Sequence, residues 1–188
     1  MEKNQKTLAL NPEFLSLNLS LTEYRTYLFS LALTVGSVAL PSALHHFYIA
    51  GQIFLPIYFL VLIGAYKLGW KVGVITAFFS VLTSFVLTGM PVLTILPFVI
   101  IKGVLLALAA SFFARRNGKL SILNMLLIVL SYQFAGLIIV YLFTHNLTLS
   151  TADLVLGYPG LLIEIIGGYI LLKSISGYGK KELETNPK

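Results

Sequence analysis

Two charged side chains lie inside long apolar stretches of the sequence. Lys102 falls within residues 92–113, and Glu164 falls within residues 155–173. A charge at the centre of a membrane helix costs about 2.5–3.5 kcal/mol on insertion scales, so such a residue generally faces a protein interior or a cavity. We therefore expect both side chains to be sheltered from lipid and to have polar neighbours.

A third apolar stretch, residues 121–143, carries Tyr132 and Gln133 near its middle. If the three stretches are packed helices, Gln133 lies at a depth similar to that of Lys102 and Glu164. Three interpretations stay open for this cluster. It could be a Lys102–Glu164 ion pair completed by Gln133, a polar pocket in which these residues and Tyr132 contact a small ligand, or a proton or ion relay.

Three further polar residues could meet a ligand before it reaches this cluster. His45 and His46 follow the first apolar stretch, and Gln52 lies just inside the second. Adjacent histidines on a helix point in different directions, so this pair predicts no metal site. We expect His45, His46 and Gln52 to lie above the central cluster, on the path of a ligand entering from outside.

Motifs for catalysis are missing from the sequence. There is no G-x-x-x-x-G-K-[ST] phosphate-binding loop and no H-E-x-x-H zinc motif, and the chain has no cysteine that could act as a nucleophile or metal ligand. We therefore predict that the chain is not an enzyme and needs no cofactor.

The composition places these residues in a membrane. Hydrophobic residues make up 57% of the 188 residues and charged residues only 11%, and the mean hydropathy is +0.90. A soluble domain carries about 25% charged residues. The chain thus has too few polar side chains to cover a water-facing globule, which excludes an ordinary cytosolic enzyme, a disordered tail and a nucleic-acid-binding domain.

The elements that must position the polar residues are membrane helices, each of which needs about 20 mostly apolar residues. We predict an all-α membrane protein, a compact bundle of six transmembrane helices occupying residues 26–173. A cytoplasmic or interfacial segment, residues 1–25, precedes the bundle, and a polar cytoplasmic tail, residues 174–188, follows it. The six predicted spans are 26–44, 50–66, 70–88, 92–113, 121–143 and 155–173.

The distribution of positive charge predicts the orientation. Twelve of the 13 Lys and Arg residues lie in the terminal segments, in the loops after the second and fourth predicted spans, or at the span ends beside them (Lys71 and Lys173), and the thirteenth is Lys102. By the positive-inside rule both termini are cytoplasmic. The formal net charge of +6 therefore reflects topology in the cell membrane, and we expect no nucleic-acid partner.

Small residues at helical spacing allow helices to pack closely in a bilayer. Four predicted spans carry such stripes, and most of them are explained by packing within one bundle. The stripe on the first span could instead dock a partner protein, and its residues are Ala32, Gly36, Ala39 and Ala43.

Three local motifs occur in order within this frame. They are Leu55-Pro56 in the second span, the glycine-rich segment 64–73 between the second and third spans, and Gly89-Met90-Pro91 between the third and fourth. Together with six short spans, they resemble the substrate-capture (S) subunits of energy-coupling factor (ECF) vitamin transporters. The resemblance covers about residues 26–173.

The resemblance implies a function and partners. Such a subunit binds a vitamin or related micronutrient from outside the cell, and it docks on an EcfT-like coupling subunit attached to two separate ATPase subunits. In the family the first helix carries an Ala-x-x-x-Ala docking face, for which Ala32-x-x-x-Gly36 and Ala39-x-x-x-Ala43 would stand in here. Lys102 would suit an anionic group of the ligand, and Glu164 an amine or ring N–H.

Two alternatives remain. The chain is also similar in size and span count to the cell-shape protein MreD, a membrane scaffold that would need no ligand pocket. An intramembrane enzyme is disfavoured by the missing motifs. A polar cavity open to the outside above Lys102 and Gln133 would favour micronutrient capture, whereas a fully packed interior would favour the scaffold.

Overall fold

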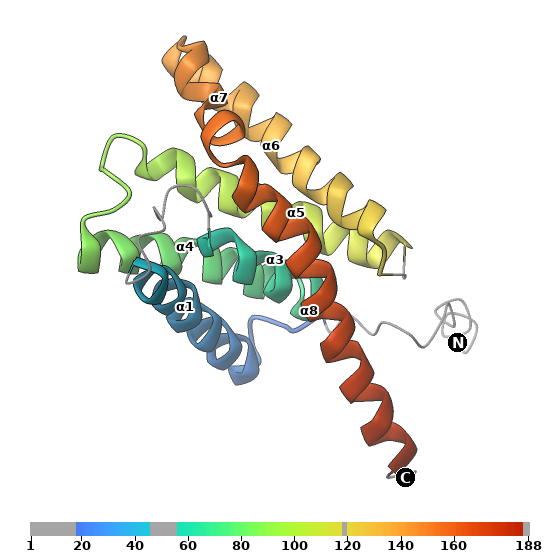
Figure 1. The fold of residues 1–188 in the computed structure, drawn as a ribbon. Coiled ribbons are helices and arrows are strands. Elements are labelled where there is room, and N and C mark those ends of the chain that lie inside the picture. The colour runs from blue at the N-terminus through green and yellow to red at the C-terminus, as the bar shows by residue number, and fades with distance from the viewer. Residues whose placement is uncertain (1–17, 46–55, 118–119, 186–188) are drawn as a thin grey trace, which may run out of the picture.

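The protein folds into helices throughout its described part (Figure 1). The structure is a computed structural model that describes residues 18–45, 56–117 and 120–185, with only the backbone described at 41–45, 56, 153 and 176–185. The helices in chain order are α1 (Tyr24–His45), α3 (Pro56–Leu68), α4 (Trp70–Thr88), α5 (Leu96–Asn117), α6 (Ile122–Thr144), α7 (Leu147–Leu156) and α8 (Tyr158–Thr185).

Four of the described helices are long and apolar enough to cross a membrane. They are α4, α5, α6 and the first 18 residues of α8, Tyr158–Ile175. These correspond to the predicted third to sixth spans, and they indicate a membrane protein. The predicted count of six is not confirmed, because only these four of the described helices meet both criteria.

Helix α3 forms the centre of the structure. It packs against α1, α4, α5 and α8, and in Figure 1 it lies among them. Its fully buried side chains are those of Val61, Leu62 and Ala65, and the side chain of Tyr66 is only 1% exposed. A helix that is apolar on all sides is stable when protein surrounds it, so α3 is a core element.

Small residues bring α3, α4 and α5 close together. A Cβ atom built on Gly73 of α4 would lie 2.5 Å from Ala65 Cβ of α3 and 2.8 Å from Ala107 Cβ of α5. One on Gly103 of α5 would lie 2.9 Å from Ala77 Cβ of α4. The small-residue stripes predicted on the third and fourth spans therefore serve internal packing.

Glycine also allows the sharp turn between α3 and α4. Only Gly69 separates the two helices, and its φ of 103° lies in a region that other residues rarely adopt. Its N–H donates to the carbonyl oxygen of Ala65 at 3.1 Å and closes the last turn of α3. This turn lets α3 and α4 pack side by side.

An additional helix, α7, occupies most of residues 144–154, which separate the predicted fifth and sixth spans. His145 ends α6 in the left-handed conformation with a φ of 49°. Asn146 then caps α7, since its side-chain Oδ1 accepts a hydrogen bond from the N–H of Leu149 at 3.0 Å. The two residues together reverse the chain between α6 and α7.

Candidate functional site

Polar side chains from α6 and α8 meet inside the structure. The hydroxyl of Tyr132 donates to Oε2 of Glu164 at 2.8 Å, and Gln133 Nε2 donates to the Tyr132 hydroxyl at 3.2 Å. These side chains are only 1–3% exposed, and Lys102 is 4% exposed. The expectation that Lys102 and Glu164 are sheltered is thus confirmed, and Tyr132 is the residue that contacts Glu164.

The helix boundaries place Lys102 and Glu164 at matching positions. Each is the seventh residue of its helix, because α5 begins at Leu96 and α8 at Tyr158. At 1.5 Å per residue each lies about 9 Å along its helix axis from the first residue. The two charged residues therefore lie nearer one helix end than the span midpoints predicted from the sequence.

Lys102 reaches toward α6 across a glycine. A Cβ atom on Gly136 would lie 2.8 Å from Lys102 Cγ, 2.9 Å from Cε and 3.2 Å from Cδ. The absence of a side chain at Gly136 therefore makes room for the aliphatic part of Lys102. Gly136 follows Gln133 by one helical turn on the same face of α6.

One oxygen of Glu164 is left without a hydrogen-bond partner. Oε2 accepts from Tyr132, whereas Oε1 is buried and has no partner in the described part of the chain. A buried acceptor without a partner costs about 1–3 kcal/mol, so Oε1 is a point at which a donor from a ligand would be stabilising.

Tyr58 of α3 is a neighbour of this cluster that the sequence did not single out. Its ring packs edge-on against Tyr132 with centroids 5.8 Å apart, and its hydroxyl donates to the carbonyl oxygen of Val99 at 3.0 Å. The sequence places it near a helix end, where a tyrosine is expected at the membrane interface. In the structure its side chain is only 2% exposed, because other helices enclose α3.

The glycine-rich face of α8 is partly filled by α3. A Cβ atom on Gly168 would lie 2.9 Å from Leu62 Cδ2, and one on Gly167 would lie 3.1 Å from Phe59 Cε2. Glu164 is buried on the same side of α8 as Gly160 and Gly168. Gly167 and Gly168 therefore allow α8 to pack closely against α3.

The predicted entry residues are not tested. His46 and Gln52 lie outside the described residues, and His45 is the last residue of α1 with only its backbone described. Their role above the cluster stays a prediction.

The small-residue stripe of α1 divides between two environments. Ala32 and Ala39 are exposed, and Ala43 lies where only the backbone is described. Gly36 is half-buried, and a Cβ atom on it would lie 2.7 Å from Leu60 Cδ1 of α3. Gly36 thus packs inside the bundle, and the two alanines remain available on the outside.

Hydroxyl side chains form the buried face of α1. Ser30 Oγ donates to the carbonyl oxygen of Thr26 at 2.8 Å and lies 3.4 Å from the carbonyl oxygen of Val72 on α4. The buried hydroxyl residues of α1 are Thr26, Ser30, Thr34 and Ser37. The side of α1 that faces the other helices is therefore the one that carries these hydroxyl residues, the hydroxyl stripe.

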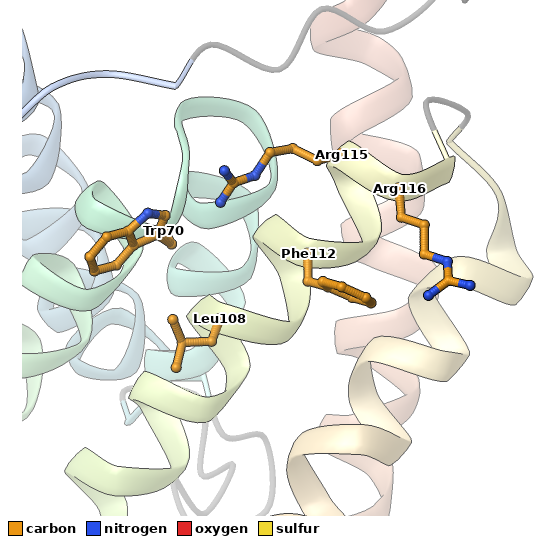
Figure 2. A pocket seen from close by; sticks show the side chains of 5 residues that line it. All are labelled: Trp70, Leu108, Phe112, Arg115 and Arg116. Atoms are coloured by element: carbon orange, nitrogen blue, oxygen red, sulfur yellow. The ribbon is translucent and has the colours of Figure 1, made fainter.

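A groove occurs at the opposite end of α5 from Lys102. It encloses about 640 Å³ and is lined by Trp70, Leu108, Phe112, Arg115 and Arg116 (Figure 2). Arg115 is 13 residues from Lys102, or about 20 Å along the helix. This groove is consequently separate from the Tyr132–Glu164 cluster.

Histidine and acidic side chains do not gather as metal ligands in the part of the chain that the structure describes. Comparison with known proteins gives no match: no family model, no curated protein and no solved structure is significantly similar to the chain.

Proposed function

We propose that the chain is the membrane-embedded substrate-binding subunit of an ECF-type importer, which captures a vitamin or related micronutrient from outside the cell. The observation that carries the proposal is the unpartnered Glu164 Oε1 inside a hydrogen-bonded network with Tyr132 and Gln133. Intramembrane polar clusters are expensive and are generally functional. The motif order of the sequence supports the same proposal.

The chemistry of the cluster favours a ligand with N–H groups. A carboxylate oxygen accepts hydrogen bonds from an amine or a ring N–H, and the Glu164–Tyr132 bond holds that carboxylate in a fixed orientation. The Lys102 stem is directed by Gly136, and its ammonium would suit an anionic group of the same ligand. The proposal therefore expects a ligand that carries both an N–H group and an anionic group.

Transport would require partners that the described chain does not supply. In the proposal, an EcfT-like coupling subunit contacts α1, and two ATPase subunits attached to it hydrolyse ATP. The exposed alanines of α1, Ala32 and Ala39, offer a surface for close helix packing. The localisation that follows is the cell membrane, with both termini cytoplasmic.

A membrane scaffold of the MreD type is the second candidate function. The close packing of Gly73 between Ala65 and Ala107 favours it, because a tightly packed centre is what a scaffold requires. A scaffold needs no ligand at Glu164, so a ligand-binding experiment separates the two candidates.

The test is thermal unfolding of the purified subunit in detergent with a panel of vitamins, namely thiamine, riboflavin, biotin and pantothenate, together with mass spectrometry of co-purifying small molecules. We expect at least one compound to raise the melting temperature of the wild type. Glu164→Gln should bind that compound at least tenfold more weakly, and its melting temperature should therefore rise less. The matched control is Ser131→Ala, an exposed residue of α6 whose hydroxyl bonds only within its own helix. No shift with any compound and no co-purifying molecule would favour the scaffold.

A further inference from the structure

The groove at the end of α5 differs in character from the buried cluster. Trp70, the first residue of α4, forms one wall, and the last turns of α5 form the other (Figure 2). Both helices are long and apolar enough to span a membrane. The groove therefore lies where two membrane helices reach the same end of the bundle.

The α5 wall changes from apolar to cationic along the helix. Leu108 is 45% exposed and Phe112 is 53% exposed, and Arg115 and Arg116 follow on the next turn. Residues four apart share one face of a helix. A molecule lying along this wall would thus contact hydrocarbon first and positive charge at its end.

Neighbouring groups hold the two guanidinium groups in place. Arg115 Nε donates to the carbonyl oxygen of Ser111 at 3.3 Å, and its Nη2 donates to Ser111 Oγ at 3.0 Å. Arg116 Cζ lies 5.8 Å from the centroid of the Phe112 ring. These contacts are to neutral groups, so they orient the side chains without cancelling their charge.

Further features mark this end of the bundle as a membrane surface. Trp70 is half-buried, and tryptophan is enriched where lipid headgroups meet hydrocarbon. Lys67 and Lys71 flank the turn between α3 and α4, next to Trp70. Anionic lipids of the cytoplasmic leaflet attract such basic residues by about 1 kcal/mol each.

We propose that this groove binds one anionic phospholipid. Its phosphate contacts Arg116, one acyl chain follows Phe112 and Leu108, and the indole of Trp70 lies at the level of the glycerol. The Arg115 guanidinium points the other way, toward Trp70, and adds positive charge at the same end of the groove (Figure 2). Guanidinium groups pair well with phosphate oxygens because their donors match the geometry of the anion. A soluble phosphate would use Arg116 alone, and only a lipid uses the apolar wall as well. The proposal does not depend on the transport function.

The test is native mass spectrometry of the full-length protein in detergent with added phosphatidylglycerol or phosphatidylcholine. We expect one phosphatidylglycerol to bind at least tenfold more tightly than phosphatidylcholine. Arg116→Gln should weaken phosphatidylglycerol binding about fivefold, in line with one lost basic contact. Leu108→Gln should weaken phosphatidylglycerol binding as well, because it makes the surface proposed to contact the acyl chain polar while it leaves both arginines in place.

A matched control is available on α8. Lys173 Nζ lies 5.6 Å from the centroid of the Tyr169 ring, so Lys173→Gln removes a cation of the same kind outside the groove. We expect Lys173→Gln to leave the affinity unchanged. Equal loss in Arg116→Gln and Lys173→Gln would overturn the proposal, as would equal binding of the two lipids. Glycerophosphoglycerol, the headgroup without acyl chains, should not compete, and full competition by it would instead show a site for soluble phosphate esters.

Discussion

The hydroxyl of Tyr132 on α6 donates a 2.8 Å hydrogen bond to Oε2 of Glu164 on α8, and both side chains are buried. This bond joins two membrane helices through a carboxylate whose other oxygen has no partner among the described residues. In hydrocarbon, polar side chains across a helix interface contribute both stability and orientation. The bond thus fixes the position of the carboxylate that the proposed ligand would meet.

Removing this hydroxyl should destabilise the protein. Tyr132→Phe keeps the ring but leaves both oxygens of Glu164 without a partner, which costs about 1–3 kcal/mol. Thermal unfolding in detergent should therefore show a lower melting temperature than wild type. Tyr141→Phe is the control, because Tyr141 is an exposed tyrosine on the same helix. An equal melting temperature for Tyr132→Phe and Tyr141→Phe would mean that the Tyr132–Glu164 bond contributes nothing.

Gly136 and Lys102 should be energetically coupled. A methyl group at Gly136 would lie within 2.8–3.2 Å of three carbons of the lysine stem, so Gly136→Ala forces Lys102 to move. In combination with Lys102→Ala the clash disappears, and the cost of Gly136→Ala should shrink by about 1 kcal/mol or more. The double-mutant cycle is measured by unfolding in detergent.

A second cycle, with Gly168→Ala and Lys102→Ala, serves as the control for this coupling. A Cβ atom on Gly168 would meet Leu62 and Met125 and no atom of Lys102 within 4 Å, so its effect and that of Lys102→Ala should add. Coupling of similar size in both cycles would contradict the placement of Lys102 over Gly136.

The centre of the bundle should tolerate no side chain at Gly73. A Cβ atom there would lie 2.5 Å from Ala65 Cβ and 3.1 Å from Ala65 Cα, and these atoms cannot move without their backbone. Gly73→Ala should therefore lower stability by about 1–3 kcal/mol or prevent folding. In Gly36→Ala the new methyl would meet only the end of Leu60, a flexible side chain, and a smaller loss is expected. Similar losses in the two variants would show that α3 and α4 separate readily.

The buried cluster was largely predictable, because a membrane helix can accommodate a charged side chain in only a few ways. Lys102 and Glu164 interrupt apolar stretches, and this alone indicates that they face inward. Their positions along the helices were predictable only approximately, since α5 begins at Leu96 and not at the residues after Pro91. The contact between Tyr132 and Glu164 depends on how α6 and α8 are rotated, which the sequence does not specify.

The inward face of α1 and the presence of α7 could not be predicted, because in each case two interpretations of one sequence pattern are equally favourable in lipid. Helix α1 has a small-residue stripe and a hydroxyl stripe, both at helical spacing, and either could pack inward. The structure turns Ser30 and Ser37 toward the bundle and leaves Ala32 exposed. Helix α7 was missed because its start depends on the cap by Asn146, in a stretch whose polar residues equally suit a loop.

The exposed alanines of α1 provide the sharpest test of partner docking. Ala32→Leu and Ala39→Leu enlarge side chains on the outer surface of α1, so they should leave ligand-induced thermal shifts unchanged and abolish uptake in cells. Gly36→Leu would not separate docking from folding, because the new side chain would collide with Leu60. Leu31→Phe is the matched control, since Leu31 is 62% exposed on the same helix but points away from the face that carries the two alanines. Normal uptake in the alanine variants would refute docking through this stripe, whereas loss of uptake in Leu31→Phe as well would indicate a broad contact over α1 in place of close packing at the alanines.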